Sequence, residues 1–148
     1  MTEPAGAVPR KVILDCDPGI DDAFAIAFAC GHPGLELCGV TTVAGNVGVD
    51  RTTANALAVL EFLGRAGVPV AAGSPAPLLR PFADARDVHG ESGLGSARLP
   101  APQGRPAGNF RNSCREWVRL PSLELEKAAP TQQNTILRFL LRGNGGKS

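Results

Sequence analysis

The sequence predicts an α/β fold of the Rossmann-like type, in which a parallel or mixed sheet is flanked by helices. Short apolar runs rich in branched residues alternate with longer segments of helical periodicity. Gly and Pro pairs separate these segments. The resulting order is strand, helix, strand, helix, strand, which predicts right-handed crossovers between parallel strands. The chain has 148 residues, enough for one domain.

The first strand and helix come directly after the N-terminal segment. Residues 11–15 form a short apolar run that a Pro-Gly pair ends, so we expect a buried strand there. Residues 22–30 are dense in Ala and Phe and precede Gly-His-Pro-Gly, which indicates a helix with a defined end. Asp21 or Asp22 is suited to cap that helix.

The next three elements repeat the alternation. Residues 35–43 include the branched run Val-Thr-Thr-Val and predict a second strand. Apolar residues recur at helical spacing over residues 49–66, and Gly67 ends that pattern. Residues 68–72 predict a short third strand. Because ligands bind beyond the carboxyl ends of such strands, the residues that follow the first two strands are candidate site residues.

Composition divides the chain near residue 102. Residues 1–100 carry seven basic and eleven acidic residues, whereas residues 101–148 carry eight basic and three acidic ones and no Asp. We therefore expect an ordered domain over residues 10–102 and a divergent, basic, poorly ordered tail over residues 103–148, with a helix at 131–142. The basic residues of the tail are scattered among few aromatic ones, which does not favour nucleic-acid binding.

Four carboxylates crowd into eight residues after the first strand: Asp15, Asp17, Asp21 and Asp22. Crowded carboxylates repel one another, and a fold accommodates them where a cation or a charged substrate compensates their charge. Carboxylate oxygens suit Ca²⁺ or Mg²⁺. The alternative is structural, with Asp15 pairing locally and Asp21 or Asp22 capping the helix.

Three further features bear on function. Asn46 follows the second strand and is either a turn residue or a hydrogen-bonding partner of a substrate. His89 lies in a Gly-rich segment and is either a polar surface residue or a ligand contact. Four cysteines lack metal-binding spacing, which favours reduced thiols in a cytoplasmic protein. We find no secretory signal and no apolar run long enough to cross a membrane.

Taken together, these segments resemble the inosine–uridine-preferring nucleoside hydrolases, which are calcium-dependent nucleoside N-ribohydrolases. The characteristic motif DxDPGxDDA stands here as DCDPGIDDA at residues 15–23. Further matches follow in order: GVTTVAGN at 39–46, NA at 55–56, VPVAAG at 68–73, PL at 77–78 and HGESGLG at 89–95. The resemblance implies the nucleoside hydrolase fold over about residues 11–102.

The resemblance also implies residue roles. Asp17 and Asp22 match Ca²⁺ ligands, and Asp17 also matches the base that deprotonates the attacking water. Asp21 and Asn46 match contacts to the ribose hydroxyls. His89 matches a histidine near the substrate. A supporting carboxylate corresponds to Asp15. The implied reaction is hydrolysis of a ribonucleoside to free base and ribose.

The chain departs from this family in length, since family members are about twice as long. The remaining implied calcium ligands, a backbone carbonyl and a late Asp, and a late His assigned to the departing base have no counterpart after residue 102. We therefore expect a truncated form of the fold whose own activity is open. The alternatives are an inactive fragment or interaction protein and, more remotely, a haloacid-dehalogenase-like phosphatase with Asp15 as nucleophile. A nucleoside is the expected small-molecule partner, with neither nucleic acid nor membrane, and a homo-oligomer is left open.

Overall fold

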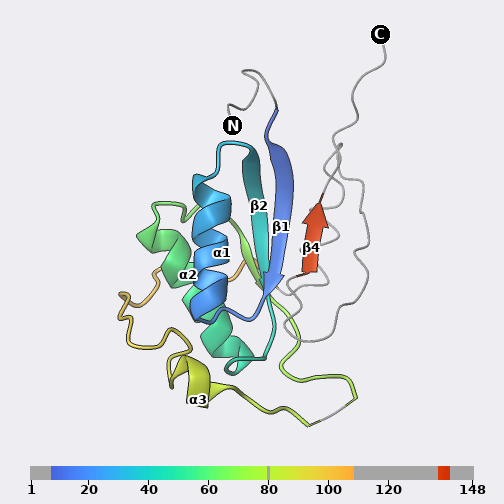
Figure 1. Cartoon of the computed structure of the whole chain (residues 1–148), viewed down its shortest axis with the longest axis vertical. Coiled ribbons are helices and arrows are strands. Elements are labelled where there is room, and N and C mark those ends of the chain that lie inside the picture. The colour runs from blue at the N-terminus through green and yellow to red at the C-terminus, as the bar shows by residue number, and fades with distance from the viewer. Residues whose placement is uncertain (1–7, 80, 109–136, 141–148) are drawn as a thin grey trace.

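The computed structural model describes residues 8–79, 81–108 and 137–140. Among these residues, strands and helices alternate along the chain, as the sequence predicts (Figure 1). The elements are β1 (Arg10–Cys16), α1 (Ile20–Gly31), β2 (Leu35–Thr42), α2 (Val49–Phe62), β3 (Val70–Ala72), the short helix α3 (Arg86–His89) and β4 (Leu137–Leu140).

The four strands form one sheet in the order β3-β2-β1-β4. Strand β1 pairs in parallel with β2, and β2 in parallel with β3, whereas β4 is antiparallel to β1. The register places Cys16 beside Thr42, so β1 and β2 end at the same edge of the sheet. The expected α/β fold with a mixed sheet is therefore confirmed, and the loops after β1 and β2 begin next to each other.

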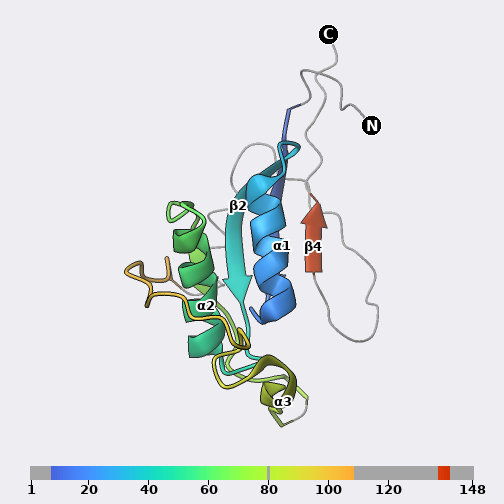
Figure 2. The ribbon, with the colours of Figure 1, turned by 60° about the vertical axis from the view of Figure 1, so that its left-hand side comes forward.

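Helices α1 and α2 pack side by side against the sheet (Figures 1 and 2). Their inner residues form the core with the strands. Ile26 of α1 and Val40 of β2 are fully buried, and Leu60 of α2 is 1% exposed. Burying side chains of this size stabilises the fold by about 1.5–3 kcal/mol each. The core thus fixes both helices relative to the carboxyl ends of β1 and β2, from which the loops after these strands extend.

Helix boundaries differ from the sequence expectation in two places. Helix α1 begins at Ile20 with Gly19 as its N-cap, so neither Asp21 nor Asp22 caps it through its side chain. Both acidic residues lie instead in the first helical turn, where the helix dipole favours negative charge. Helix α2 ends at Phe62, and the amide of Leu63 donates a hydrogen bond to the carbonyl of Val59.

The helix expected at residues 131–142 is wrong at residues 137–140, which form strand β4. Residues 131–136 and 141–142 lie outside the described residues. A short apolar run fits both a helix and a strand, and pairing with the free edge of β1 decides for the strand here.

The chain after residue 102 remains attached to the fold as far as residue 108. The Glu61 carboxylate accepts hydrogen bonds from the amides of Gln103 and Gly104, at 2.7–3.1 Å. The amide of Ala107 donates to the carbonyl of Val70 in β3. Residues 109–136 and 141–148 of the expected basic tail lie outside the described residues. The domain boundary at residue 102 stays a prediction.

Some apolar surface remains exposed on the two long helices. Phe24 and Phe62 are 74% and 71% exposed. They border an apolar groove of about 410 Å³, together with Leu94 and Leu99. No helix in the described part of the chain is long and apolar enough to cross a bilayer.

Matched substitutions on α1 test the assignment of its buried face. Ile26→Ala removes a fully buried side chain, and we expect it to lower the free energy of unfolding by about 2–5 kcal/mol. Phe24→Ala removes a mostly exposed side chain and should cost less than about 1 kcal/mol. Urea denaturation followed by circular dichroism measures both changes. Equal losses in the two variants would contradict this orientation of α1.

Candidate functional site

A hydrogen bond joins two of the four clustered Asp residues across the turn between β1 and α1. The carboxylate of Asp22 reaches back over the turn, and its Oδ2 accepts a hydrogen bond of 3.1 Å from the amide of Asp17. This bond reaches past the N-cap Gly19 to a residue two positions before it. Asp22 is only 4% exposed. This bond ties the end of the strand to the start of the helix.

The loop after β2 joins the same turn. Asp17 Oδ2 accepts a hydrogen bond of 2.7 Å from the amide of Asn46, and Asn46 Nδ2 donates to the carbonyl of Asp17 at 2.9 Å. The parallel sheet thus brings Asp17 and Asn46 together, as their places after neighbouring strands predict. Gly45 permits this approach, because a Cβ atom there would overlap the carboxylate of Asp17.

The other two carboxylates differ in their surroundings. Asp15 lies in β1, and its Oδ1 accepts a hydrogen bond of 2.5 Å from the hydroxyl of Thr41 in β2. Asp21 is exposed in the first turn of α1, where its charge acts on both Asp17 and Asp22. The structure therefore gathers all four carboxylates around one strand end.

His89 comes to the site from a segment much later in the chain. It ends α3, and its Nδ1 accepts a hydrogen bond of 3.3 Å from the amide of Ile20. The imidazole and Asn46 Nδ2 both pack against Gly19, where a Cβ would lie 2.5 Å from either nitrogen. The amide of Ala85 donates to the carbonyl of Asn46 at 3.0 Å, which holds the start of α3 against the Asn46 loop.

Asn55 has a role that its sequence context alone does not reveal. It lies on the buried side of α2, and its Nδ2 donates to the carbonyl of Pro18 at 3.0 Å and to that of Ser92 at 2.8 Å. One amide group therefore joins the β1–α1 turn to the loop after His89. A buried polar side chain needs a hydrogen-bonding partner, so a buried Asn on a helix points to such a link.

The charges of this cluster are poorly compensated by the described residues. Burial, followed by the negative charges of Asp17 and Asp21, raises the pKa of Asp22 to about 6. Burial also raises the pKa of Asp15 and of Asp17, although hydrogen bonds from Thr41 and Asn46 oppose these shifts. Removal from water and mutual repulsion destabilise ionised carboxylates, and a nearby cation reverses both effects.

These residues fit part of a calcium shell. Asp17 and Asp22 offer the carboxylate oxygens that Ca²⁺ prefers, but the ion takes six to eight ligands. Residues 8–79, 81–108 and 137–140 hold no group of three or more His, Cys, Asp or Glu side chains arranged to bind a metal. The donor chemistry therefore fits the ion, while the number of ligands falls short within this part of the chain.

The three cysteines of the described chain, Cys16, Cys30 and Cys38, are free thiols. Burial raises the pKa of the Cys16 thiol, and the neighbouring carboxylates raise it further. This thiol therefore stays protonated and is not a nucleophile. Cys114 lies outside the described residues.

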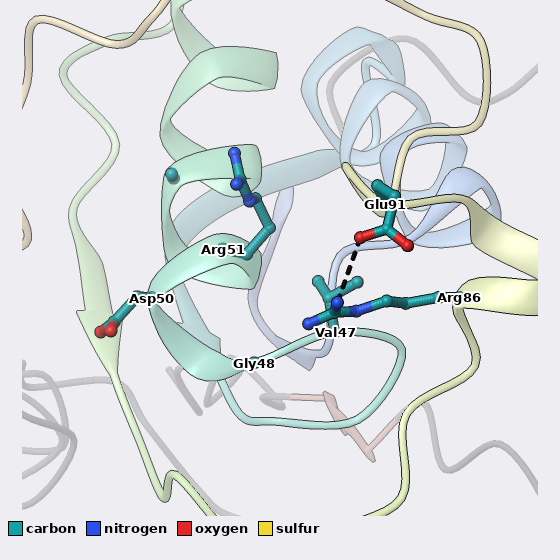
Figure 3. Close-up of a pocket in the computed structure, with 7 residues that line it drawn as sticks. Val47, Gly48, Asp50, Arg51, Arg86 and Glu91 are labelled. Carbon is teal, nitrogen blue, oxygen red and sulfur yellow. Dashed lines mark hydrogen bonds and ion pairs between the residues drawn. The ribbon is translucent and has the colours of Figure 1, made fainter.

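A cavity of about 380 Å³ opens where the Asn46 loop runs into α2. Figure 3 shows Arg86 pointing toward Glu91, with Arg51 to the left of this pair and Asp50 turned away. Arg86 and Glu91 form an ion pair of 3.1 Å. Two basic and two acidic residues line this cavity, so their formal charges balance. The ion pair is exposed and contributes at most about 1 kcal/mol, but it spans the segment that carries His89.

Comparison with known proteins gives a consistent result. The family model for inosine-uridine preferring nucleoside hydrolase matches residues 12–144. An inosine-uridine preferring nucleoside hydrolase of Leishmania major is 52% identical over 93 residues, which cover 63% of this chain and 30% of that protein. The pyrimidine-specific ribonucleoside hydrolase RihA of Shewanella sp. (strain MR-7) is 50% identical over 137 residues, which cover 92% of this chain and 43% of that protein.

Solved structures agree with these sequence matches. A plant nucleoside hydrolase has a TM-score of 0.60 and 43% identity, covering 68% of this chain and 32% of its own. A purine-preferring ribonucleoside hydrolase from Gardnerella vaginalis has a TM-score of 0.70 and 31% identity, covering 74% of this chain and 36% of its own. The chain spans less than half the length of each of these relatives. With the match over residues 12–144, the chain belongs to the inosine-uridine preferring nucleoside hydrolase family.

Proposed function

We propose that this chain provides the calcium-binding and ribose-binding part of a nucleoside N-ribohydrolase site. The reaction is hydrolysis of the N-glycosidic bond of a ribonucleoside to free base and ribose. The observation that carries this proposal is the network joining Asp17, Asp22 and Asn46 at the carboxyl ends of β1 and β2. Ligands of open α/β sheets bind at this edge.

Two of the four carboxylates are the proposed calcium ligands. Asp17 and Asp22 would hold Ca²⁺ through their carboxylate oxygens. The sequence contains no Asp after Asp87, so the late Asp of the family resemblance has no counterpart in this chain. Because calcium affinity depends on the number of charged ligands, we expect Ca²⁺ to bind this chain weakly, with a dissociation constant of about 10⁻⁴ M or higher.

The remaining residues would hold the substrate. The exposed Asp21 and the loop residue Asn46 contact ribose hydroxyls, and His89 faces the nucleoside. Asp15, held by Thr41, adds negative charge behind Asp17. When bound, calcium would supply positive charge that lowers the pKa of a water molecule and polarises the ribose hydroxyls.

Asp17 is the proposed base of the reaction. It takes a proton from the attacking water, whose oxygen forms a bond to C1′ as the N-glycosidic bond breaks. The electron pair of that bond leaves with the nucleobase, which takes a proton from solvent, and Asp17 afterwards releases to solvent the proton that it took from the water. Positive charge develops on the ribose in the transition state, and the carboxylates at the end of β1 stabilise it electrostatically.

Two measurements on the purified chain test the proposal: calorimetric titration with Ca²⁺, and ribose release from inosine or uridine. Binding and release together support a hydrolase. If neither occurs while a full-length relative is active, the chain is a non-catalytic member of the family. This is the alternative function that we considered for so short a chain. A cytoplasmic location and a homo-oligomeric state are further expectations, which cell fractionation and analytical ultracentrifugation test.

Asp17→Asn is the most direct variant. It weakens a proposed calcium ligand and removes the proposed base, so we expect calcium affinity to fall at least tenfold. Ribose release should fall by about two or more orders of magnitude. Asp50→Asn is the matched control, because Asp50 is exposed in the first turn of α2. This variant should leave calcium affinity and ribose release unchanged. Wild-type values in Asp17→Asn would overturn the assignment.

Gly45→Ala tests the close approach of the Asn46 loop to Asp17. The new Cβ displaces the Asp17 carboxylate, so calcium affinity should fall by roughly 10-fold to 100-fold. Gly48→Ala adds the same atom in the same loop where no atom lies within 4 Å, and we expect no change in affinity. Calorimetry on the two variants decides the matter, and similar affinities in both would contradict the packing described for Gly45.

The pH dependence of the free energy of unfolding tests whether the negative charge of Asp22 is uncompensated in the folded chain. Because the pKa of Asp22 in the folded chain is about 6, above its ordinary value of 3.8, folding favours its protonated form. Its contribution to stability is therefore fully present below about pH 4 and is lost as the pH rises through about 6. In EDTA, the free energy of unfolding should fall over this range, and Asp22→Asn should make the fall smaller. Urea denaturation at a series of pH values measures this, and identical profiles for the two proteins would contradict it.

A further inference from the structure

The hydrogen bond between Ile20 and His89 joins two segments that lie 69 residues apart. The donor is the backbone amide of Ile20, the first residue of α1, and the acceptor is the imidazole Nδ1 of His89 at 3.3 Å. The first amides of a helix have no partner within the helix. His89 supplies a partner for one of them, while Gly19, the N-cap, has no side chain that could do so.

The imidazole is held in this position from both sides. Its ring packs against Gly19, where a Cβ would lie 2.5 Å from Nδ1 and 2.8 Å from Cε1. The backbone of His89 is fixed as well, since its amide donates to Ala85 at 2.9 Å and its carbonyl accepts from Gly95 at 2.7 Å. The ring therefore has a defined orientation relative to the turn that carries Asp17.

A hydrogen bond accepted at Nδ1 determines where the imidazole proton lies. Neutral histidine carries one proton, and the nitrogen that accepts a bond from an amide cannot also carry it. We propose that the backbone amide of Ile20 is a positioning group that holds His89 in the tautomer with its proton on Nε2.

The consequence concerns what His89 offers to a substrate, and it rests on the proposed function, in which His89 faces the nucleoside. With Nδ1 occupied by the amide, the ring presents Nε2–H, which donates hydrogen bonds and accepts none. His89 then selects a nucleoside group with a lone pair, such as a carbonyl oxygen or an unprotonated ring nitrogen. It does not serve as a base toward the attacking water, a role that stays with Asp17.

Proline at position 20 removes this one amide with little other change. Proline is well tolerated at the first position of a helix, and the residue before it must be extended. Gly19 already has that conformation, with φ −102° and ψ −161°. Ile20→Ala is the matched control, because it shortens the same side chain while it keeps the amide. Circular dichroism establishes that α1 is intact in both variants.

Imidazole ¹⁵N spectra of the chain at a pH where both histidines are neutral measure the tautomer directly. The chain contains two histidines, and the second, His32, accepts a bond from the amide of Gly34 at its own Nδ1. His32 is therefore an internal reference that neither substitution touches. A His32→Gln variant assigns the two sets of resonances.

We expect wild-type His89 to show the pattern of a single tautomer with the proton on Nε2. In Ile20→Pro the His89 pattern should change to that of a tautomer mixture. In Ile20→Ala the His89 pattern should stay as in the wild type, and the His32 pattern should stay unchanged in both variants. Protonation of wild-type His89 on Nδ1, or an unchanged His89 spectrum in Ile20→Pro, overturns the inference. If Ile20→Pro fails to fold, the wild-type spectrum and Gly19→Ala, which displaces the ring, decide the question.

Addition of inosine and Ca²⁺ to the same sample separates this inference from the proposed function. A change at Nε2–H with Nδ1 unaffected supports both. A single Nε2–H tautomer that does not respond to inosine keeps the positioning role of Ile20 and counts against the nucleoside-facing role of His89.

Discussion

The structure of the site depends on the crowding of carboxylates at the end of β1. Ionised carboxylates that are removed from water repel one another, and the fold satisfies them only in part. Backbone amides of Asp17 and Asn46 donate to two of them, and the Thr41 hydroxyl donates to a third. The pKa of Asp22 nevertheless rises to about 6. The described residues therefore do not fully balance the negative charge of this cluster.

This constraint explains why so many segments converge on one short turn. The turn between β1 and α1 is held by Asn46 from the loop after β2, by Asn55 from α2 and by His89 from α3. The convergence requires backbone without side chains at the contact points, and Gly19 and Gly45 provide it. Each of these three partners is polar, so directional hydrogen bonds hold the turn in place.

Much of the fold could be predicted from sequence because local signals and tertiary structure agree there. The order of the first five elements follows from periodicity and from Gly and Pro placement, and the neighbourhood of Asp17 and Asn46 follows from parallel strands. The identity of strand β4 could not be predicted, because its short apolar run is decided by pairing with β1. The link made by Asn55 and the bond between Ile20 and His89 depend on segments far apart in sequence, which no local pattern reports. The proposed roles of the site residues came from resemblance to a family, since spacing alone leaves a structural explanation for each.

The amides that donate to the clustered carboxylates give this site natural probes of its own state. The amides of Asp17 and Asn46 exchange with solvent only when their bonds to Asp22 and Asp17 open. A cation that draws these carboxylates toward itself competes with the same bonds. Hydrogen exchange at these two backbone positions therefore reports on occupancy without any label, substrate or change of sequence, and it does so in a chain of any length that contains this turn.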